Sequence, residues 1–126
     1  MKKILIVIAD YYEEISSLLL KSTKKNLNNF SIKIIKVPGV FEIPITISKN
    51  IKKYDAFLAL GCVIKGETPH FDFISSASTQ AIMNLAVESK KPIGNGIITC
   101  LNKKQAKARG KKGKEAAKAV ISVLSQ

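Results

Sequence analysis

Tryptophan is absent from this chain of 126 residues, and histidine occurs only once. Cysteine occurs twice, as Cys62 and Cys100, which is too few for the disulfide framework of a small secreted domain or for a cysteine-based metal site. We interpret both as reduced packing residues and predict no metal site. The apolar runs are far shorter than the ~20 residues that span a membrane, so we expect no membrane segment.

The first nine residues imitate a signal peptide, with two lysines before an apolar segment. However, Asp10, Glu13 and Glu14 follow without a small-residue cleavage site, so a buried first strand is the better interpretation. We therefore expect a cytosolic location. The length, without repeats or low-complexity linkers, predicts one domain over residues 1–126 that buries roughly two-thirds of its unfolded surface.

Acidic residues are scarce: nine stand against 21 lysines and arginines, giving a net charge of +12. Residues 103–118 alone hold eight basic residues beside the single Glu115. They have no interleaved aromatic residues and match no recognition motif, which is typical of a solvated helix face. We therefore predict no nucleic-acid binding. A positive field also favours the capture of phosphorylated small molecules.

Four segments have the composition of β-strands. Residues 2–9 and 56–64 are continuous apolar runs, as expected for strands buried on both faces of a parallel sheet. Residues 31–37 alternate, which favours an edge position, and residues 93–99 follow a Lys-Pro break.

Apolar residues recur at helical spacing after each of these segments. We predict a first helix with Asp10 as its N-cap and Ile15, Leu18 and Leu19 on its inner face. The remaining predicted helices cover residues 43–54, 69–89, a short segment capped by Asn102, and 112–124. This order predicts an α/β protein with a three-layer flavodoxin-like fold, in which helices cover both faces of a four-stranded parallel sheet.

A polar stretch follows the third predicted strand, where open α/β sheets bind their ligands. It contains Lys65, Gly66, Glu67, Thr68 and His70. Gly66 allows close backbone approach, and a helix beginning near residue 69 offers free N–H groups, so a phosphate fits here. His70 adds acid/base capacity near neutral pH. A lone histidine at a helix start is also often structural, and residue type alone leaves both interpretations open.

Two further positions lie at the same predicted sheet edge. Tyr11 follows the first strand, where its ring either covers a planar ligand or packs at the start of the first helix. Glu42 lies in the first turn of the second helix, where a carboxylate ordinarily compensates the helix dipole.

The stretch Gly-Cys-Val-Ile-Lys-Gly-Glu-Thr-Pro-His-Phe-Asp at residues 61–72 resembles the signature of the 6,7-dimethyl-8-ribityllumazine synthase family. Val-Pro-Gly-Val-Phe-Glu-Ile-Pro at residues 37–44 resembles a second signature of that family. The resemblance covers nearly the whole chain. It implies a cofactor-free transferase that condenses 5-amino-6-(D-ribitylamino)uracil with 3,4-dihydroxy-2-butanone 4-phosphate, in the penultimate step of riboflavin synthesis.

The resemblance also implies site roles. His70 is the expected catalytic residue. The expected substrate-binding residues are Tyr11, Val40, Phe41, Glu42, Cys62, Val63, Ile64, Gly66, Glu67, Thr68, Asn95, Arg109 and Lys112. Tyr11 replaces a phenylalanine that stacks on the pyrimidine, and Asn95 replaces an aromatic residue donated by a neighbouring subunit. About five residues usually found after Arg109 are missing, which bears on the position of Lys112.

Members of the family place the active site between subunits of a pentamer, and some assemble twelve pentamers into a capsid. The absence of an N-terminal extension and the shortened final connector favour pentamers without a capsid. Riboflavin synthase is a candidate partner in the same pathway. A non-catalytic flavin- or nucleotide-binding module on the same fold is the alternative function, and it does not require His70.

Overall fold

A four-stranded parallel sheet forms the middle layer of the protein, with strand order β2-β1-β3-β4. The computed structural model describes residues 1–66 and 69–126. The strands are β1 (Lys3–Ala9), β2 (Ser31–Val37), β3 (Ala56–Ile64) and β4 (Ile93–Cys100). The central strands β1 and β3 are the continuous apolar runs, and the alternating strand β2 lies at an edge, as predicted.

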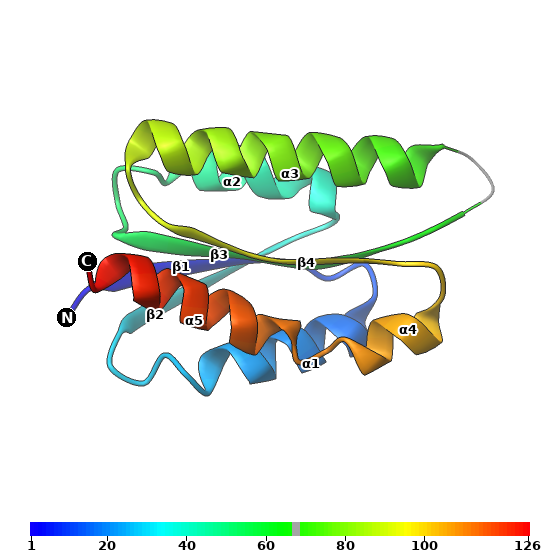
Figure 1. Cartoon of the computed structure of the whole chain (residues 1–126), viewed down its shortest axis with the longest axis horizontal. Helices are drawn as coiled ribbons and strands as arrows, with labels where there is room; N and C mark the ends of the chain where they lie inside the picture. The colour runs from blue at the N-terminus through cyan, green and yellow to red at the C-terminus, as the bar shows by residue number, and fades with distance from the viewer. Residues whose placement is uncertain (67–68) are drawn as a thin grey trace.

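Helices cover both faces of the sheet (Figure 1). Helices α2 (Ile43–Lys49) and α3 (His70–Ser89) lie on one face, and α1 (Glu13–Lys24), α4 (Lys103–Ala108) and α5 (Lys112–Leu124) lie on the other. A short 3₁₀ helix, η1 (Val40–Glu42), leads into α2. The predicted three-layer flavodoxin-like fold is therefore confirmed.

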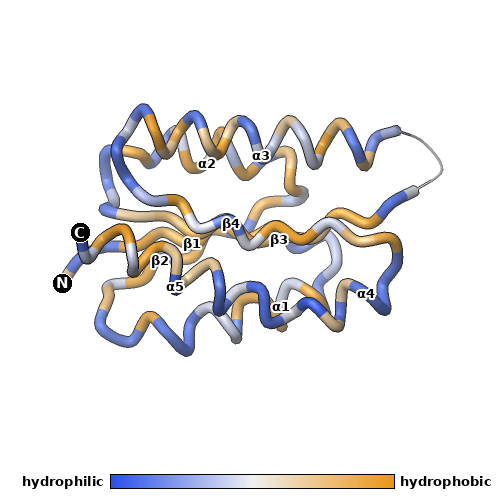
Figure 2. The backbone as a smooth tube through the Cα atoms, viewed as in Figure 1, coloured by the Kyte–Doolittle hydropathy of each residue, from blue (hydrophilic) through white to orange (hydrophobic). Residues whose placement is uncertain are grey.

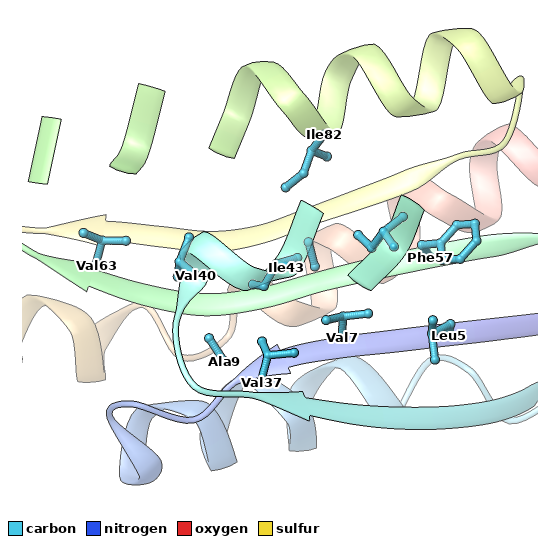
Figure 3. Close-up of a cluster of buried hydrophobic side chains, with 11 residues drawn as sticks. Leu5, Val7, Ala9, Val37, Val40, Ile43, Phe57, Val63 and Ile82 are labelled. Carbon is cyan, nitrogen blue, oxygen red and sulfur yellow. The ribbon is translucent and has the colours of Figure 1, made fainter. Parts of the chain in front are cut away.

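Apolar side chains gather on both faces of the sheet, and Figure 2 shows hydrophobic residues concentrated along the strands. One buried cluster joins Leu5, Val7 and Phe57 on the strands to Ile43 and Ile82 on α2 and α3 (Figure 3). A second cluster packs the opposite face of β1 and β3 against α5, and a third packs α1 and α4 against the ends of β3 and β4. No helix in the described ranges is long and apolar enough to cross a membrane.

Three local predictions were wrong. Helix α1 starts at Glu13 with Tyr12 in the N-cap position, because the Asp10 N–H instead donates to the Val37 carbonyl at 3.1 Å and continues the β1–β2 pairing. Leu18 is not on the inner face; its side chain is 41% exposed beside Gly110. Helix α2 ends at Lys49, and the turn that follows still packs its apolar residues against the core.

Candidate active site

A cavity of about 680 Å³ lies at the carboxyl ends of β1, β2 and β3. In a sheet of this order, the topological switch point lies between β1 and β3, because the connections on its two sides run towards opposite edges of the sheet. Open α/β sheets bind their ligands at this point. Eight of the predicted site residues line this cavity: Tyr11, Val40, Phe41, Glu42, Cys62, Val63, Ile64 and His70.

The segment after β1 brings two tyrosines to the cavity. The buried Ser16 hydroxyl donates to the Ala9 carbonyl at 2.6 Å, which ties the end of β1 to the first turn of α1. Tyr11 and Tyr12 lie between these two anchored points, and both line the cavity. Tyr11 is 75% exposed, whereas Tyr12 is partly buried.

The segment after β2 forms the side of the cavity with η1. The Glu42 N–H donates to the Gly39 carbonyl at 3.1 Å, and the Thr46 hydroxyl donates to the Glu42 carbonyl at 2.8 Å. Val40 is buried against Gly61, and Phe41 is 68% exposed. The Glu42 carboxylate is half-buried beside Gly39, so the cavity has an acceptor next to an exposed aromatic ring.

The floor of the cavity is neutral. Cys62 on β3 is diagonally opposite Cys100 on β4, since Cys62 pairs with Ile98 and Ile64 pairs with Cys100. Burial first, and then the Cys100 thiol, raises the pKa of Cys62 to about 12. Both cysteines are free and buried, as predicted. A protonated thiol leaves this surface suited to an uncharged ring.

His70 is the first residue of α3, and its exposed side chain lines the cavity. The β3–β4 pairing continues to the edge of the same region, where the Lys65 N–H donates to the Cys100 carbonyl at 2.9 Å. Gly66 is exposed, and a side-chain carbon there would meet no described atom within 4 Å. The predicted positions Glu67 and Thr68 lie outside the described residues.

The three remaining predicted residues, Asn95, Arg109 and Lys112, line a different cavity of about 690 Å³ beside β4. Asn102 accepts from the Gln105 N–H at 2.9 Å and caps α4, which ends at Ala108 with Arg109 as its C-cap residue. The Arg109 Nη1 donates to the Thr99 carbonyl at 3.2 Å.

Positive charge dominates this second cavity. Lys112 makes an exposed ion pair with Glu115 at 3.0 Å, while Arg109 and Lys111 add two further positive charges. A guanidinium and two ammonium groups around one carboxylate leave an excess of donors, so the cavity is suited to an anion.

The predicted site is therefore divided within one chain, because no described residue lines both cavities. One cavity offers an imidazole, an acceptor carboxylate and aromatic surface, and the other offers cationic donors. Tyr12 and Ile74 also line the first cavity, although neither was among the predicted site residues, and Gly39 of the 37–44 stretch joins them. Because Tyr12 directly follows Tyr11 at the carboxyl end of a buried strand, its position along the chain could have predicted a place in the site.

Among residues 1–66 and 69–126, no three His, Cys, Asp or Glu side chains are grouped closely enough to hold a metal ion. The groups that converge at the sheet edge are those of proton transfer and of polar and aromatic recognition. The fold and this arrangement define the chain as a flavodoxin-like α/β protein with a candidate ligand cavity at the carboxyl ends of its strands.

Comparison with known proteins identifies the family. The sequence model of the family described as 6,7-dimethyl-8-ribityllumazine synthase matches residues 1–126. A 6,7-dimethyl-8-ribityllumazine synthase of Rhodopseudomonas palustris strain BisA53 is 41% identical over 95% of this chain and 82% of its own length. The synthase of Bartonella tribocorum is 42% identical over 97% of this chain and 87% of its own length. The synthase of Bartonella bacilliformis is 46% identical over 89% of this chain and 78% of its own length. The chain belongs to the 6,7-dimethyl-8-ribityllumazine synthase family.

Proposed function

We propose that the protein condenses 5-amino-6-(D-ribitylamino)uracil with 3,4-dihydroxy-2-butanone 4-phosphate to give 6,7-dimethyl-8-ribityllumazine, inorganic phosphate and water in riboflavin biosynthesis. The observation that carries this proposal is the pair of cavities with complementary chemistry. A planar, polyhydroxylated pyrimidine suits the aromatic cavity with its carboxylate, and a phosphorylated ketone suits the cationic cavity.

In the aromatic cavity, Tyr11 stacks on the pyrimidine ring, and the backbone of Val40 and Phe41 contacts the heterocycle and its ribityl chain. Glu42 accepts hydrogen bonds from ribityl hydroxyls. The β3 residues Cys62, Val63 and Ile64 form the floor beneath the ring. These roles are supported by the position of all of these residues around one cavity.

The phosphate is held by Arg109 and Lys112, together with the loop at Gly66, Glu67 and Thr68. A guanidinium can donate two parallel hydrogen bonds to phosphate oxygens, whereas an ammonium acts as a point charge. Asn95, on β4 beside this cationic group, faces the pyrimidine edge of the neighbouring site.

The chemistry requires proximity and proton transfer. The amine of the pyrimidine attacks the ketone and water leaves to form an imine, phosphate is then eliminated, and the second nitrogen closes the ring with loss of another water. Holding both substrates together supplies most of the acceleration. His70 accepts and returns protons in these steps, and its place in the cavity wall supports that role.

The active site is shared between subunits, with the aromatic cavity of one subunit facing the cationic cavity of the next in a cyclic pentamer. Two observations support this arrangement. The two predicted halves of the site lie on separate cavities of one chain. In addition, α3 buries only Ser78 and Ile82 among its described residues, while Phe73, Met83 and Val87 are exposed, which leaves apolar surface for another subunit. The two reduced thiols support a cytosolic location.

The test of the reaction is to mix the protein with both substrates and follow the product by its visible absorption and fluorescence, while phosphate is measured separately. We expect product and phosphate in equal amounts. A protein that shifts the spectrum of added flavin but forms neither compound is a binding module, and the proposed reaction is then wrong.

The shared site is tested by co-refolding His70→Ala with Arg109→Ala in equal amounts. Each variant alone should be nearly inactive. In mixed rings, roughly a quarter of the head-to-tail interfaces pair an intact His70 with an intact Arg109, so activity should rise towards that fraction. Mixing preformed assemblies is the control and should recover much less. If mixed rings, verified by mass spectrometry, remain inactive, both residues serve the same subunit's site.

A further inference from the structure

Tyr12 lines the same cavity as Tyr11, and the two side chains meet ring to ring. The two ring centroids are 4.9 Å apart, with an interplanar angle of 77°, so the rings meet edge to face. Tyr12 also packs against the buried cluster that includes Ile15, Leu19 and Cys62. The exposed ring therefore rests on a ring that is itself anchored in the core.

Two further contacts restrain Tyr12. Its carbonyl accepts from the Ser16 N–H at 2.9 Å, which fixes its backbone at the start of α1. The Lys103 ammonium, on the first residue of α4, lies 6.0 Å from the Tyr12 ring centroid, within the range of a cation–π contact. Tyr12 is thus held by the core cluster, by α1 and by α4, and its ring also meets the exposed Tyr11 ring.

The chemistry of Tyr12 suits support better than proton transfer. Burial, followed by Tyr11 and Cys62, raises the pKa of its phenol above the ordinary 10.0. The group therefore stays protonated around neutral pH and adds no negative charge beside the apolar floor.

We propose that Tyr12 is a positioning residue that holds the Tyr11 ring in place for stacking on the planar ring of the substrate. The proposal rests on the proposed function, because it assumes that Tyr11 contacts a heterocycle. An exposed tyrosine without a support samples several rotamers, and binding must then immobilise it at an entropic cost. A supported ring is already ordered before the ligand arrives.

The experiment is a double-mutant cycle read out by the dissociation constant for riboflavin, measured by quenching of flavin fluorescence. Tyr12→Leu keeps apolar packing against the core cluster and removes the ring, and its fold is checked by thermal unfolding. We expect this variant to weaken binding about three- to tenfold, in line with the usual strength of an aromatic pair. Tyr12→Phe retains the ring and should bind within about twofold of the wild type. The Tyr11→Ala, Tyr12→Leu double variant should bind no more weakly than Tyr11→Ala alone.

Lys103→Met and Lys104→Met are matched variants on the same helix. Only Lys103 contacts the Tyr12 ring, so the first should weaken flavin binding by about two- to fivefold and the second should not. In the turnover assay, Tyr12→Leu should raise KM for the pyrimidine and change kcat little. The Tyr12 ring holds the Tyr11 ring in place for substrate binding and takes no part in proton transfer.

The outcomes separate this proposal from the proposed function. The positioning role is wrong if a folded Tyr12→Leu variant binds flavin as tightly as the wild type. It is also wrong if the effects of the Tyr11 and Tyr12 substitutions on the dissociation constant multiply. Neither result contradicts the proposed reaction. A loss in Tyr12→Phe as large as in Tyr12→Leu would assign the effect to the hydroxyl and also overturn it. Failure of the wild type to form product refutes the proposed reaction, whereas the flavin cycle still tests Tyr12.

Discussion

Gly61 on β3 controls the position of the wall of the aromatic cavity, and Gly61→Ala tests this. A methyl carbon at Gly61 would lie 2.8 Å from Val40 Cγ2 and 3.1 Å from the Ala9 side chain. Carbon atoms normally approach to about 3.5–4.0 Å, so Val40 has to retreat by roughly 1 Å. Val40, labelled in Figure 3, begins η1. Phe41 and Glu42 complete this short helix, so displacement of Val40 should move both of them.

The expected magnitudes follow from this overlap. Overpacking a core costs about 1–3 kcal/mol, and the lower entropy of the unfolded alanine chain offsets about 0.4–1 kcal/mol of it. We expect a net loss of about 1–2 kcal/mol in the free energy of unfolding, measured by urea titration. A shift of about 1 Å in a substrate-binding wall can cost up to about 100-fold, so kcat/KM should fall about 10- to 100-fold.

Gly94→Ala is the matched control on the opposite face of the sheet. Its methyl carbon would lie 2.6 Å from the Ala116 carbonyl oxygen and 2.9 Å from Val120 Cγ2, against α5 and away from η1. It should destabilise the protein at least as much. Because α5 also carries Lys112 and Glu115, which line the second cavity, any effect on the folded enzyme should fall on KM for the phosphorylated substrate and leave KM for the pyrimidine nearly unchanged. The reasoning about Val40 is refuted if Gly61→Ala retains wild-type kcat/KM, or if Gly94→Ala raises KM for the pyrimidine as much.

Three other predictions concern chemistry. His70→Ala should lower kcat by roughly 10- to 1000-fold with KM nearly unchanged, because the imidazole moves protons and does not hold substrate; unchanged turnover removes it from the mechanism. Arg109→Lys should raise KM for the phosphorylated substrate more than for the pyrimidine, since only the former loses bidentate contacts, and equal increases contradict a phosphate role. Cys62, with a pKa raised to about 12 from an ordinary 9.0, should be alkylated at pH 8 about 1000-fold more slowly than an ordinary thiol, and faster as pH rises. Mass spectrometry measures the alkylation rate of Cys62 in the folded protein and in the unfolded chain. Equal rates in the folded and unfolded states would show that burial does not protect the thiol.

Local sequence alone determined the elements in which neighbouring residues decide the outcome. Strand β3 is continuously apolar because both of its faces are covered, and β2 alternates because it lies at an edge. Asn102 caps α4 through a bond to a residue three positions along the chain, so no distant contact was needed to predict it. The long signature at residues 61–72 likewise identified the family before the fold was known.

Tertiary contacts decided what local patterns could not. Asp10 has the side chain of an N-cap, but its backbone pairs with Val37, which is 27 positions further along the chain, and α1 starts later. The apolar repeat after Lys49 continues because the turn packs on the core, and burial of apolar residues does not require a helix.

The division of the candidate site also depended on the sheet order. Placing β1 between β2 and β3 brings the segments after these three strands to one cavity, whereas β4 lies at the far edge and carries Asn95 to another. Spacing along the chain contains no information on strand order, because that order is set by which apolar faces pack together. For the same reason, only the structure placed Tyr12 against the Tyr11 ring on one side and the core on the other.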